Sequence, residues 1–451
     1  MLHNYLKDLN EAQKEAVVNT EGPALIIAGA GSGKTRVLTY RIAHLLEKGV
    51  KANRILALTF TNKAAGEMKE RITKIVGEEN ARNLWMGTFH SIFARFLRRD
   101  GSYLGYKSNF TIYDTDNTRS LLRSIIKELQ LDDSVYKPAA VGARISHAKN
   151  NLITAQQYSQ VPQITESDRN SKTPEMAAIY RTYAIRCFKA NAMDFDDLLL
   201  NMNILFRDFP AVLGEYRKRF DYILVDEYQD TNYSQYMIVR KLSEESRNLC
   251  VVGDDAQSIY SFRGARIENI LNFKNDYPDF HLFKLEQNYR STQTIVNAAN
   301  SIIDRNEGQI KKKVFSKNDV GEKIRVIQTL TDGEEGALVS SDILDTRMRD
   351  RAEWKDFAIL YRTNAQSRIF EEMLRKRNIP YKVFGGTSFY ERREIRDLIA
   401  YLRLAVNPDD AEALKRIINY PKRGIGETTV QKLSELAQQL DISVWTLITS
   451  E

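Results

Sequence analysis

The chain has 451 residues and a formal net charge of +7, with 43% hydrophobic and 28% charged side chains. These proportions are those of folded globular proteins, and the length predicts about three domains. Two widely separated cysteines, Cys187 and Cys250, exclude a disulfide scaffold and a CxxC metal site. No apolar run reaches the ~18 residues that a membrane helix needs, and the first residues lack the apolar core of a signal peptide. We therefore expect a cytoplasmic protein without a membrane partner.

Short apolar segments alternate with helical patterns in the N-terminal part, which predicts a parallel sheet with helices on both faces. The expected strands are Ala24–Ala28, Ile55–Phe60, Tyr222–Val225, Leu249–Val252 and Leu282–Leu285. They are followed by clusters of polar and small residues, namely GAGSGKT, TNKAA, DEYQD, GDDAQ and QNYRS. Because ligands of open parallel sheets bind beyond the carboxyl ends of the strands, this placement predicts a binding site at one sheet edge.

The strand signal fades over residues 115–195, where NTRSLLRSIIKELQ and EMAAIYRTYAIRCFKA have helical periodicity and ITESDRNSKTP is loop-like. This region is interpreted as a helical insertion. A second alternation begins after Asn288, with strand-like IRVIQT, DFAILYRT and YKVF, and helical EEGALVSSDILDTRMRD and SRIFEEMLRKRN. It predicts a second α/β unit, and from about Thr387 the pattern is helical again.

A glycine-rich segment follows the first strand and opens a helix: Ala28-Gly29-Ala30-Gly31-Ser32-Gly33-Lys34-Thr35. Glycines let backbone N–H groups converge on phosphate oxygens, and the helix N-terminus adds partial positive charge. Lys34 is expected to reach the β- and γ-phosphates of a nucleotide and Thr35 to bind Mg²⁺. Ala28 stands where the strict pattern has glycine, so this is its relaxed form. The alternative is a left-handed glycine turn without a ligand.

The acids that such a site needs lie in FDYILVDEYQD. Asp226 follows four apolar residues and is expected to hold Mg²⁺, while Glu227 would orient or deprotonate the attacking water. A solvated strand end is the alternative for this acidic pair. Together, the two motifs predict hydrolysis of a nucleoside triphosphate.

Eight segments then occur in the order found in one family. They are LNEAQKEAV, AGAGSGKTRVL, LTFTNKAAGEMKER, GTFHSIFARFLR, DEYQDTN, VVGDDAQSIYSFRGA, QNYRST and GGTSFYERREIRDLIAYLRL. The chain resembles the UvrD/PcrA/Rep-type superfamily 1A ATP-dependent DNA helicases over nearly its whole length. The resemblance implies ATP and Mg²⁺ as cofactors, single-stranded DNA and its junctions with duplex as partners, and 3′-to-5′ movement in DNA repair or replication.

The resemblance also implies an α/β fold of two RecA-like P-loop domains, 1A and 2A, each interrupted by a helical insertion, 1B and 2B. We expect domain 1A at residues 1–114 and 196–284, 1B at 115–195, a partial 2A at 285–386 and the start of 2B at 387–451.

Two family motifs are expected after 2B and are not found, namely a DNA-contacting His-Ser-Ala-Lys-Gly-like run and a Thr-Arg-Ala run with a second arginine finger. Ile145-Ser146-His147-Ala148-Lys149 resembles the first but falls in the insertion, so we expect it to be a decoy. The chain is therefore expected to be C-terminally truncated. Two hypotheses follow: part of a working helicase, or an ATP- and DNA-binding module with little turnover, since one missing finger costs ~10³ or more in rate.

Further nucleotide contacts are implied by the resemblance. Gln13 is similar to the adenine-reading glutamine and Tyr289 to the aromatic residue that stacks on the base. Gln257 is similar to the side chain that senses the γ-phosphate, Arg290 to an arginine finger, and Arg36 is expected near the nucleotide. Each of these side chains, taken alone, also fits an ordinary solvated surface.

Nucleic-acid contacts require aromatic faces for bases and cations or amides for phosphates. By resemblance, Phe60, Asn62, His90, Phe262 and Arg263 lie along the single-strand track. Phe262 stands where relatives usually carry Trp, and Phe60 also fits a core residue that closes a buried strand.

The turn PKRGIG before ETTVQKL resembles a helix–hairpin–helix motif. Gly424 and Gly426 are therefore expected to expose backbone N–H groups to duplex phosphates. A plain connection between two helices is the alternative.

Overall fold

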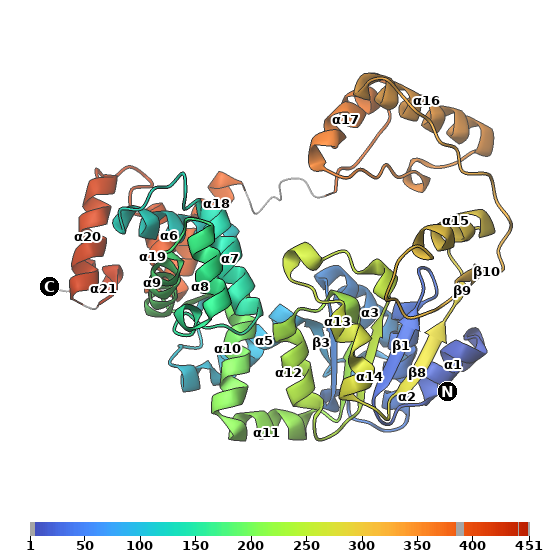
Figure 1. Ribbon diagram of the computed structural model, residues 1–451, viewed down its shortest axis with the longest axis horizontal. Helices are drawn as coiled ribbons and strands as arrows, with labels where there is room; N and C mark the ends of the chain where they lie inside the picture. The colour runs from blue at the N-terminus through green and yellow to red at the C-terminus, as the bar shows by residue number, and fades with distance from the viewer. Residues whose placement is uncertain (1–4, 385–391, 441, 450–451) are drawn as a thin grey trace. The chain divides into compact units, whose positions relative to one another are not determined.

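A computed structural model describes residues 5–384, 392–440 and 442–449 (Figure 1). The chain divides into two compact units, residues 1–322 with 401–451 and residues 323–400. Every candidate site residue named above falls in the first unit.

Six parallel strands form the central sheet of the first unit, in the order β3-β2-β6-β7-β1-β8 (Figure 1). The strands are β1 Ala24–Ala28, β2 Ile55–Thr59, β3 Trp85–Thr88, β6 Tyr222–Val225, β7 Leu249–Gly253 and β8 His281–Leu285. The five strands expected from the sequence are present, with ends within one residue of the expected bounds. Sequence reasoning missed β3, because its sequence WMGT contains a glycine and lacks the β-branched apolar run seen in most of the other strands.

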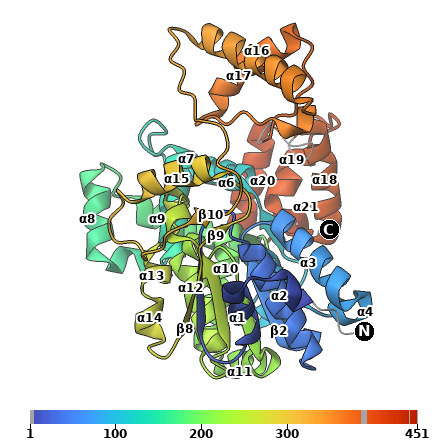
Figure 2. The same cartoon turned by 90° about the vertical axis from the view of Figure 1, so that its right-hand side faces the viewer.

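Both faces of the sheet are covered by helices (Figure 2). In β1, all five residues are buried, with Leu25 and Ile27 in one core and Ala24 and Ile26 in the other. The second core is covered by α1 Glu11–Val18, α2 Lys34–Glu47 and α3 Asn62–Val76. The first core is covered by α5 Phe89–Asp100, α10 Phe195–Asp208, α11 Pro210–Arg219, α12 Tyr233–Ser243, α13 Glu268–Leu271 and α14 Phe273–Asp276. The short α4 Glu78–Ala81 leads into β3.

The helical insertion packs around a third core of its own. Its helices are α6 Thr115–Glu128, α7 Pro138–Asn150, α8 Pro162–Asn170 and α9 Met176–Lys189, and it is bracketed by the paired strands β4 Thr111–Tyr113 and β5 Ala192–Asp194. The expectation of a loop over ITESDRNSKTP is wrong in its first part, where α8 forms. Pro162 stands in the first turn of this helix, where a missing N–H costs nothing.

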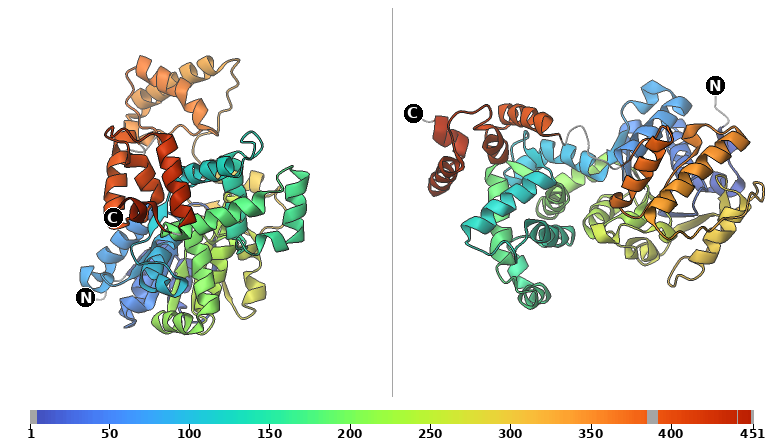
Figure 3. Two further views of the ribbon diagram at one scale, coloured as in Figure 1. Left: turned by 90° about the vertical axis from the view of Figure 1, so that its left-hand side faces the viewer. Right: turned by 90° about the horizontal axis from the view of Figure 1, so that it is seen from above.

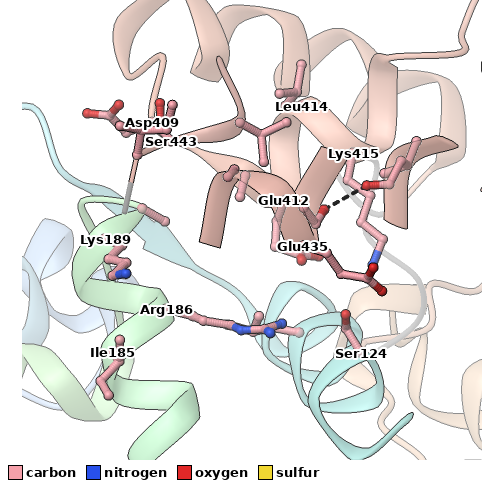
Figure 4. Close-up of a pocket in the computed structure, with 18 of the residues that line it drawn as sticks. Ser124, Ile185, Arg186, Lys189, Asp409, Glu412, Leu414, Lys415, Glu435 and Ser443 are labelled. Carbon is pink, nitrogen blue, oxygen red and sulfur yellow. Dashed lines mark hydrogen bonds between the residues drawn. The ribbon is translucent and has the colours of Figure 1, made fainter. Parts of the chain in front are cut away.

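The C-terminal helices α19 Ala411–Ile417, α20 Glu427–Gln439 and α21 Val444–Thr449 lie beside the insertion (Figure 3). The buried Asn407 side chain joins them to it, donating to Thr111 Oγ1 and to the Ala190 carbonyl, both at 3.0 Å. A pocket of about 230 Å³ lies at this junction, and Arg186, Glu412 and Lys415 are among its lining side chains (Figure 4).

A second, smaller parallel pair continues the first unit after the large sheet. Strand β9 Gln287–Asn288 pairs with β10 Phe315–Ser316, and α15 Gln293–Ile303 lies between them in sequence. This pair begins the alternation that the sequence predicts after Asn288.

The second unit contains α16 Asp332–Asp350, α17 Ser367–Lys376 and the first part of α18 Arg393–Val406. Both helices predicted before residue 385 are confirmed, whereas the strands predicted in IRVIQT, DFAILYRT and YKVF are wrong: residues 323–384 contain no strand. Apolar side chains of these segments, such as Val326 and Leu330, are exposed. A strand needs a hydrogen-bonded neighbour, and none lies beside these segments in the described part of this unit.

The base of the insertion contains a buried lysine between two largely buried carboxylates. Lys149 Nζ lies 2.6 Å from Asp194 Oδ2 and 2.7 Å from Asp197 Oδ1. Burial opposes the charge of Lys149, but the two carboxylates outweigh it and raise the pKa of this lysine well above its usual value. Lys149, the last residue of the ISHAK run, is therefore buried in an ion pair and is not exposed to DNA.

Lys149→Met is expected to destabilise the first unit by about 3–5 kcal/mol, because it leaves two buried carboxylates without their cation. Urea denaturation monitored by circular dichroism measures this loss. Lys127→Met on the exposed side of α6 is the control and should change stability little. Equal stabilities of the two variants would contradict the buried-cluster assignment.

Candidate nucleotide and nucleic-acid site

The glycine-rich segment forms the turn between β1 and α2. Gly31 has a φ of 67° and Gly33, the residue before α2, has a φ of 90°. Both are left-handed conformations that glycine adopts without steric cost. A side chain at Gly31 is excluded a second time, because its Cβ would lie 2.7 Å from Asn288 Nδ2.

The backbone of this turn is fixed by hydrogen bonds from distant parts of the chain. The carbonyl oxygens of residues 30, 31 and 32 accept from Asn288 Nδ2 at 2.7 Å, the Tyr289 N–H at 3.0 Å and Gln13 Nε2 at 2.9 Å, respectively. Three successive carbonyl groups of the turn are therefore satisfied by other parts of the chain. Sequence reasoning did not single out Asn288, although it stands in the QNYRS motif.

Lys34 begins α2 with its ammonium group buried. Lys34 Nζ lies 3.4 Å from Glu227 Oε2, but it makes no hydrogen bond within the described part of the chain. A buried cation at a helix N-terminus, without a hydrogen-bond acceptor, fits a phosphate group. Thr35 follows in the first turn of the same helix. These residues therefore fit the triphosphate of a nucleotide.

The acidic pair stands directly after β6. Asp226 is buried, and burial together with the charge of Glu227 raises its pKa to about 7. Glu227 has a φ of 49°, a left-handed conformation that is strained for this residue, and its N–H donates to Asp226 Oδ1 at 3.0 Å. A buried carboxylate beside a second one fits a divalent cation, which would restore its charge.

A chain of buried polar side chains leads from this pair to the end of β7. Gln229 Nε2 donates to Glu227 Oε2 at 2.9 Å, and Gln229 Oε1 accepts the Asp254 N–H at 3.0 Å. Asp254 Oδ2 in turn accepts from Gln257 Nε2 at 2.5 Å. The structure thus connects the predicted residues Glu227 and Gln257 through Gln229 and Asp254, which sequence reasoning missed. Their signal is that they stand in the same two motifs, directly after buried strands.

The residues expected around the adenine base gather at the start of α1. Asn10 Nδ2 donates to the half-exposed Tyr289 hydroxyl at 2.7 Å, and the Asn10 N–H donates to Gln13 Oε1 at 3.2 Å. Both the oxygen and the nitrogen of the Gln13 amide therefore have protein partners. To bind adenine, Gln13 would have to exchange these hydrogen bonds for hydrogen bonds to the base. Arg290 is exposed, with its Cβ beside Gly31. The Arg36 guanidinium is partly exposed, 4.0 Å from the carboxylate of Asp8.

Three aromatic rings follow one another from β2 to the segment after β7, and we call Phe60, Tyr260 and Phe262 the aromatic track. The ring centroids of Phe60 and Tyr260 are 5.0 Å apart, and those of Tyr260 and Phe262 are 6.0 Å apart. Phe262 is 76% exposed, and the Arg263 guanidinium lies 5.6 Å from its ring. Phe60 therefore packs in this track rather than in the strand core. Sequence reasoning missed Tyr260, although SIYSFRG contains two aromatic residues.

Asn62 follows β2, shortly after Phe60, and His90 follows β3 of the same sheet. The His90 ring is perpendicular to the half-exposed ring of Phe195, with centroids 5.7 Å apart. Burial lowers the pKa of His90 to about 4, so this imidazole is neutral at physiological pH. Asn62 is exposed at the start of α3. Sequence reasoning did not name Phe195, although its half-exposed ring lies beside His90.

Gly424 and Gly426 stand in the turn between α19 and α20, apart from the sheet edge. Asn419 Oδ1 closes this turn by accepting the N–H groups of Arg423 at 2.8 Å and Ile425 at 3.3 Å. Gly424 has a φ of 74°, and no atom would contact a Cβ at either glycine. The turn therefore has a defined shape, with space around both glycines. This fits a helix–hairpin–helix turn and a plain connection between two helices equally.

The comparison with known proteins identifies the family. Residues 9–278 match the UvrD/REP helicase N-terminal domain, and residues 283–451 match the UvrD-like helicase C-terminal domain. The chain belongs to the UvrD-like helicase family. Membership confirms the predicted RecA-like α/β fold, which the parallel sheet displays.

The curated relatives include two proteins named ATP-dependent DNA helicase PcrA. The Leuconostoc citreum protein is 47% identical over 443 residues, which is 98% of this chain and 58% of the relative. The Staphylococcus aureus (strain Mu50) protein is 47% identical over 442 residues, which is 98% of this chain and 59% of the relative. This member of the family thus spans less than two thirds of these relatives. In the described part of the chain, no helix has the length and apolarity of a membrane span.

Asp226→Asn is expected to stabilise the metal-free protein at pH 8 by as much as ~4 kcal/mol. The folded protein keeps the Asp226 proton up to about pH 7, whereas the unfolded chain releases it near pH ~4. The folded state therefore loses stability as pH rises through this window, and asparagine, which cannot ionise, avoids the loss.

Thermal melting in EDTA from pH 4 to pH 8 measures this difference, which should shrink towards pH 4. Asp133→Asn at an exposed position is the control. A parallel pH dependence of wild type and Asp226→Asn would show that Asp226 is ionised in the fold.

Proposed function

We propose that this chain is the nucleotide- and DNA-binding part of an ATP-dependent 3′-to-5′ DNA helicase. The supporting observation is that a series of side-chain contacts connects the buried Lys34 to Gln257, which lies on the loop that also carries Phe262. Lys34 lies 3.4 Å from Glu227, and Gln229 and Asp254 lead from Glu227 to Gln257. Phe262 then follows Gln257 on the same loop.

In this proposal, the glycine turn and Lys34 hold the β- and γ-phosphates of ATP. Thr35 and Asp226 would hold Mg²⁺, which neutralises phosphate charge when bound. Glu227 orients the attacking water and accepts its proton, and its strained backbone fixes the carboxylate next to Lys34. Gln257 and Arg290 would meet the γ-phosphate, and Gln13, Tyr289 and Arg36 would surround the base and sugar.

Single-stranded DNA is proposed to lie along the carboxyl end of the sheet. The aromatic track offers ring faces for bases, and Arg263 and Asn62 offer donors to phosphates. His90 is neutral and contributes a polar contact beside the half-exposed ring of Phe195. The Gly424–Gly426 turn would bind the duplex side of a junction through its backbone N–H groups.

The names of the relatives support ATP and DNA as ligands. The direction of movement, a role in repair or replication, a cytoplasmic location and the boundaries of 1A, 1B, 2A and 2B rest on the motif resemblance. A second candidate is a module that binds ATP and DNA with little turnover. It is favoured by the second unit, where the segments predicted as strands are unpaired within residues 323–384.

Lys34→Ala is expected to weaken binding of Mg·ATP by about tenfold or more, because one charge-assisted contact to phosphate is lost. Isothermal titration calorimetry measures the affinity, and Lys51→Ala at an exposed position is the control. An unchanged affinity in Lys34→Ala would remove Lys34 from the phosphate site.

Phe262→Ala is expected to weaken binding of an oligothymidine strand by roughly 1–3 kcal/mol, since one stacking face is lost. Fluorescence anisotropy measures this affinity. Tyr103→Ala, which removes an exposed aromatic ring elsewhere, should leave it unchanged. Equal effects of the two substitutions would argue against the aromatic track as the DNA site.

A further inference from the structure

The segment of residues 309–316, which joins α15 to β10, contacts the loop after β7. The Ile310 N–H donates to Asp255 Oδ2 at 2.7 Å. Two residues on, Lys312 Nζ lies 2.9 Å from Asp254 Oδ1 and also contacts Asp255 Oδ1. The 309–316 segment is therefore attached to both acids of the GDDAQ motif.

Lys312 is unlike its neighbours in this segment. Its side chain is only 5% exposed, and those of Asp254 and Asp255 are 3% and 0% exposed, whereas Lys311 and Lys313 are exposed. Burial disfavours the charge of Lys312, but the two carboxylates outweigh it and raise the pKa of Lys312. This lysine is thus a buried cation that two buried carboxylates require, and its removal would leave them unpaired.

The two carboxylate oxygens of Asp254 have different partners. Its Oδ1 faces Lys312 and also accepts the Ala256 N–H at 3.1 Å, while its Oδ2 accepts from Gln257 Nε2 at 2.5 Å. A carboxylate is planar, so fixing one oxygen fixes the direction of the other. Lys312 and the Ala256 N–H together thus fix the carboxylate that accepts from the Gln257 amide.

The same segment also contacts the glycine turn. A Cβ at Gly29 would lie 2.5 Å from Val314 Cγ2, so the Val314 side chain packs directly on the turn. The Phe315 N–H then donates to the Glu286 carbonyl at 3.0 Å and joins β10 to the strand before Tyr289. One short segment thus touches the phosphate turn, the GDDAQ loop and the QNYRS strand.

We infer that Lys312 is a positioning residue for recognition of the γ-phosphate. By holding Asp254, it orients the Gln257 amide so that its second N–H can meet the terminal phosphate, without itself touching the nucleotide. This inference rests on the proposed function, because it requires a nucleoside triphosphate in the glycine turn.

The test compares the affinities of Mg·ADP and Mg·ATPγS by isothermal titration calorimetry. The variants are Lys312→Met, the double variant Lys312→Met/Asp255→Asn and the exposed control Lys313→Met. The double variant removes one carboxylate together with the Lys312 cation, so the net buried charge stays the same. It therefore separates the effect of Lys312 on Asp254 orientation from its effect on the stability of the fold. Thermal melting is recorded for each variant.

Lys312→Met should bind ADP as the wild type does, while its preference for ATPγS over ADP falls roughly five- to tenfold, as expected for a misaligned hydrogen bond to a charged group. The double variant should recover thermal stability but not this preference, and Lys313→Met should retain both. An undiminished preference in Lys312→Met, or its full recovery in the double variant, would overturn the inference alone. Wild type that binds neither nucleotide would overturn the proposed function, and the inference with it.

Discussion

The buried ammonium group of Lys34 is the interaction on which the candidate site depends. It lies 3.4 Å from Glu227 and makes no hydrogen bond within the described residues. An unsatisfied buried cation costs free energy, so the surrounding fold must hold it in place. The parallel sheet does so, because β1 and β6 end at the same edge and deliver Lys34 and the acidic pair to one place. The stability of the fold is thus lowered at the point where phosphate chemistry would occur.

Buried polar contacts extend this arrangement away from the phosphate turn. The side chains of Gln229, Asp254 and Lys312 are each almost fully buried. Gln229 joins Glu227 to Asp254, and Lys312 contacts Asp254 and Asp255. Breaking one of these buried contacts at a time would leave polar groups unpaired. The network of contacts is therefore expected to switch between two complete arrangements rather than to deform gradually. Under the proposed function, loss of the terminal phosphate would therefore change the position of Gln257. This change would move the loop that carries Tyr260 and Phe262 of the aromatic track.

Five of the six strands of the large sheet could be predicted from the sequence, because they are short, apolar and followed by a motif. The positions of Lys34 and Asp226 follow from the same pattern, whereas Phe262 is expected from the family resemblance. Gln229 and Asp254 were missed although both stand in motifs that follow buried strands. Lys312 could not be predicted, since a lysine between two other lysines has no periodicity that marks burial. The strands expected in IRVIQT and DFAILYRT fail for a different reason: an apolar pattern predicts a strand only where a neighbour supplies the hydrogen bonds.

The proposed function requires the nucleotide site and the DNA site to be coupled within this chain. The affinity of the wild-type chain for an oligothymidine strand, measured with saturating Mg·ATPγS and again with saturating Mg·ADP, tests this coupling. We expect the two affinities to differ by about fivefold or more, which is typical of coupled sites. Equal affinities in the two nucleotide states would contradict the coupling, even if ATP and DNA both bind.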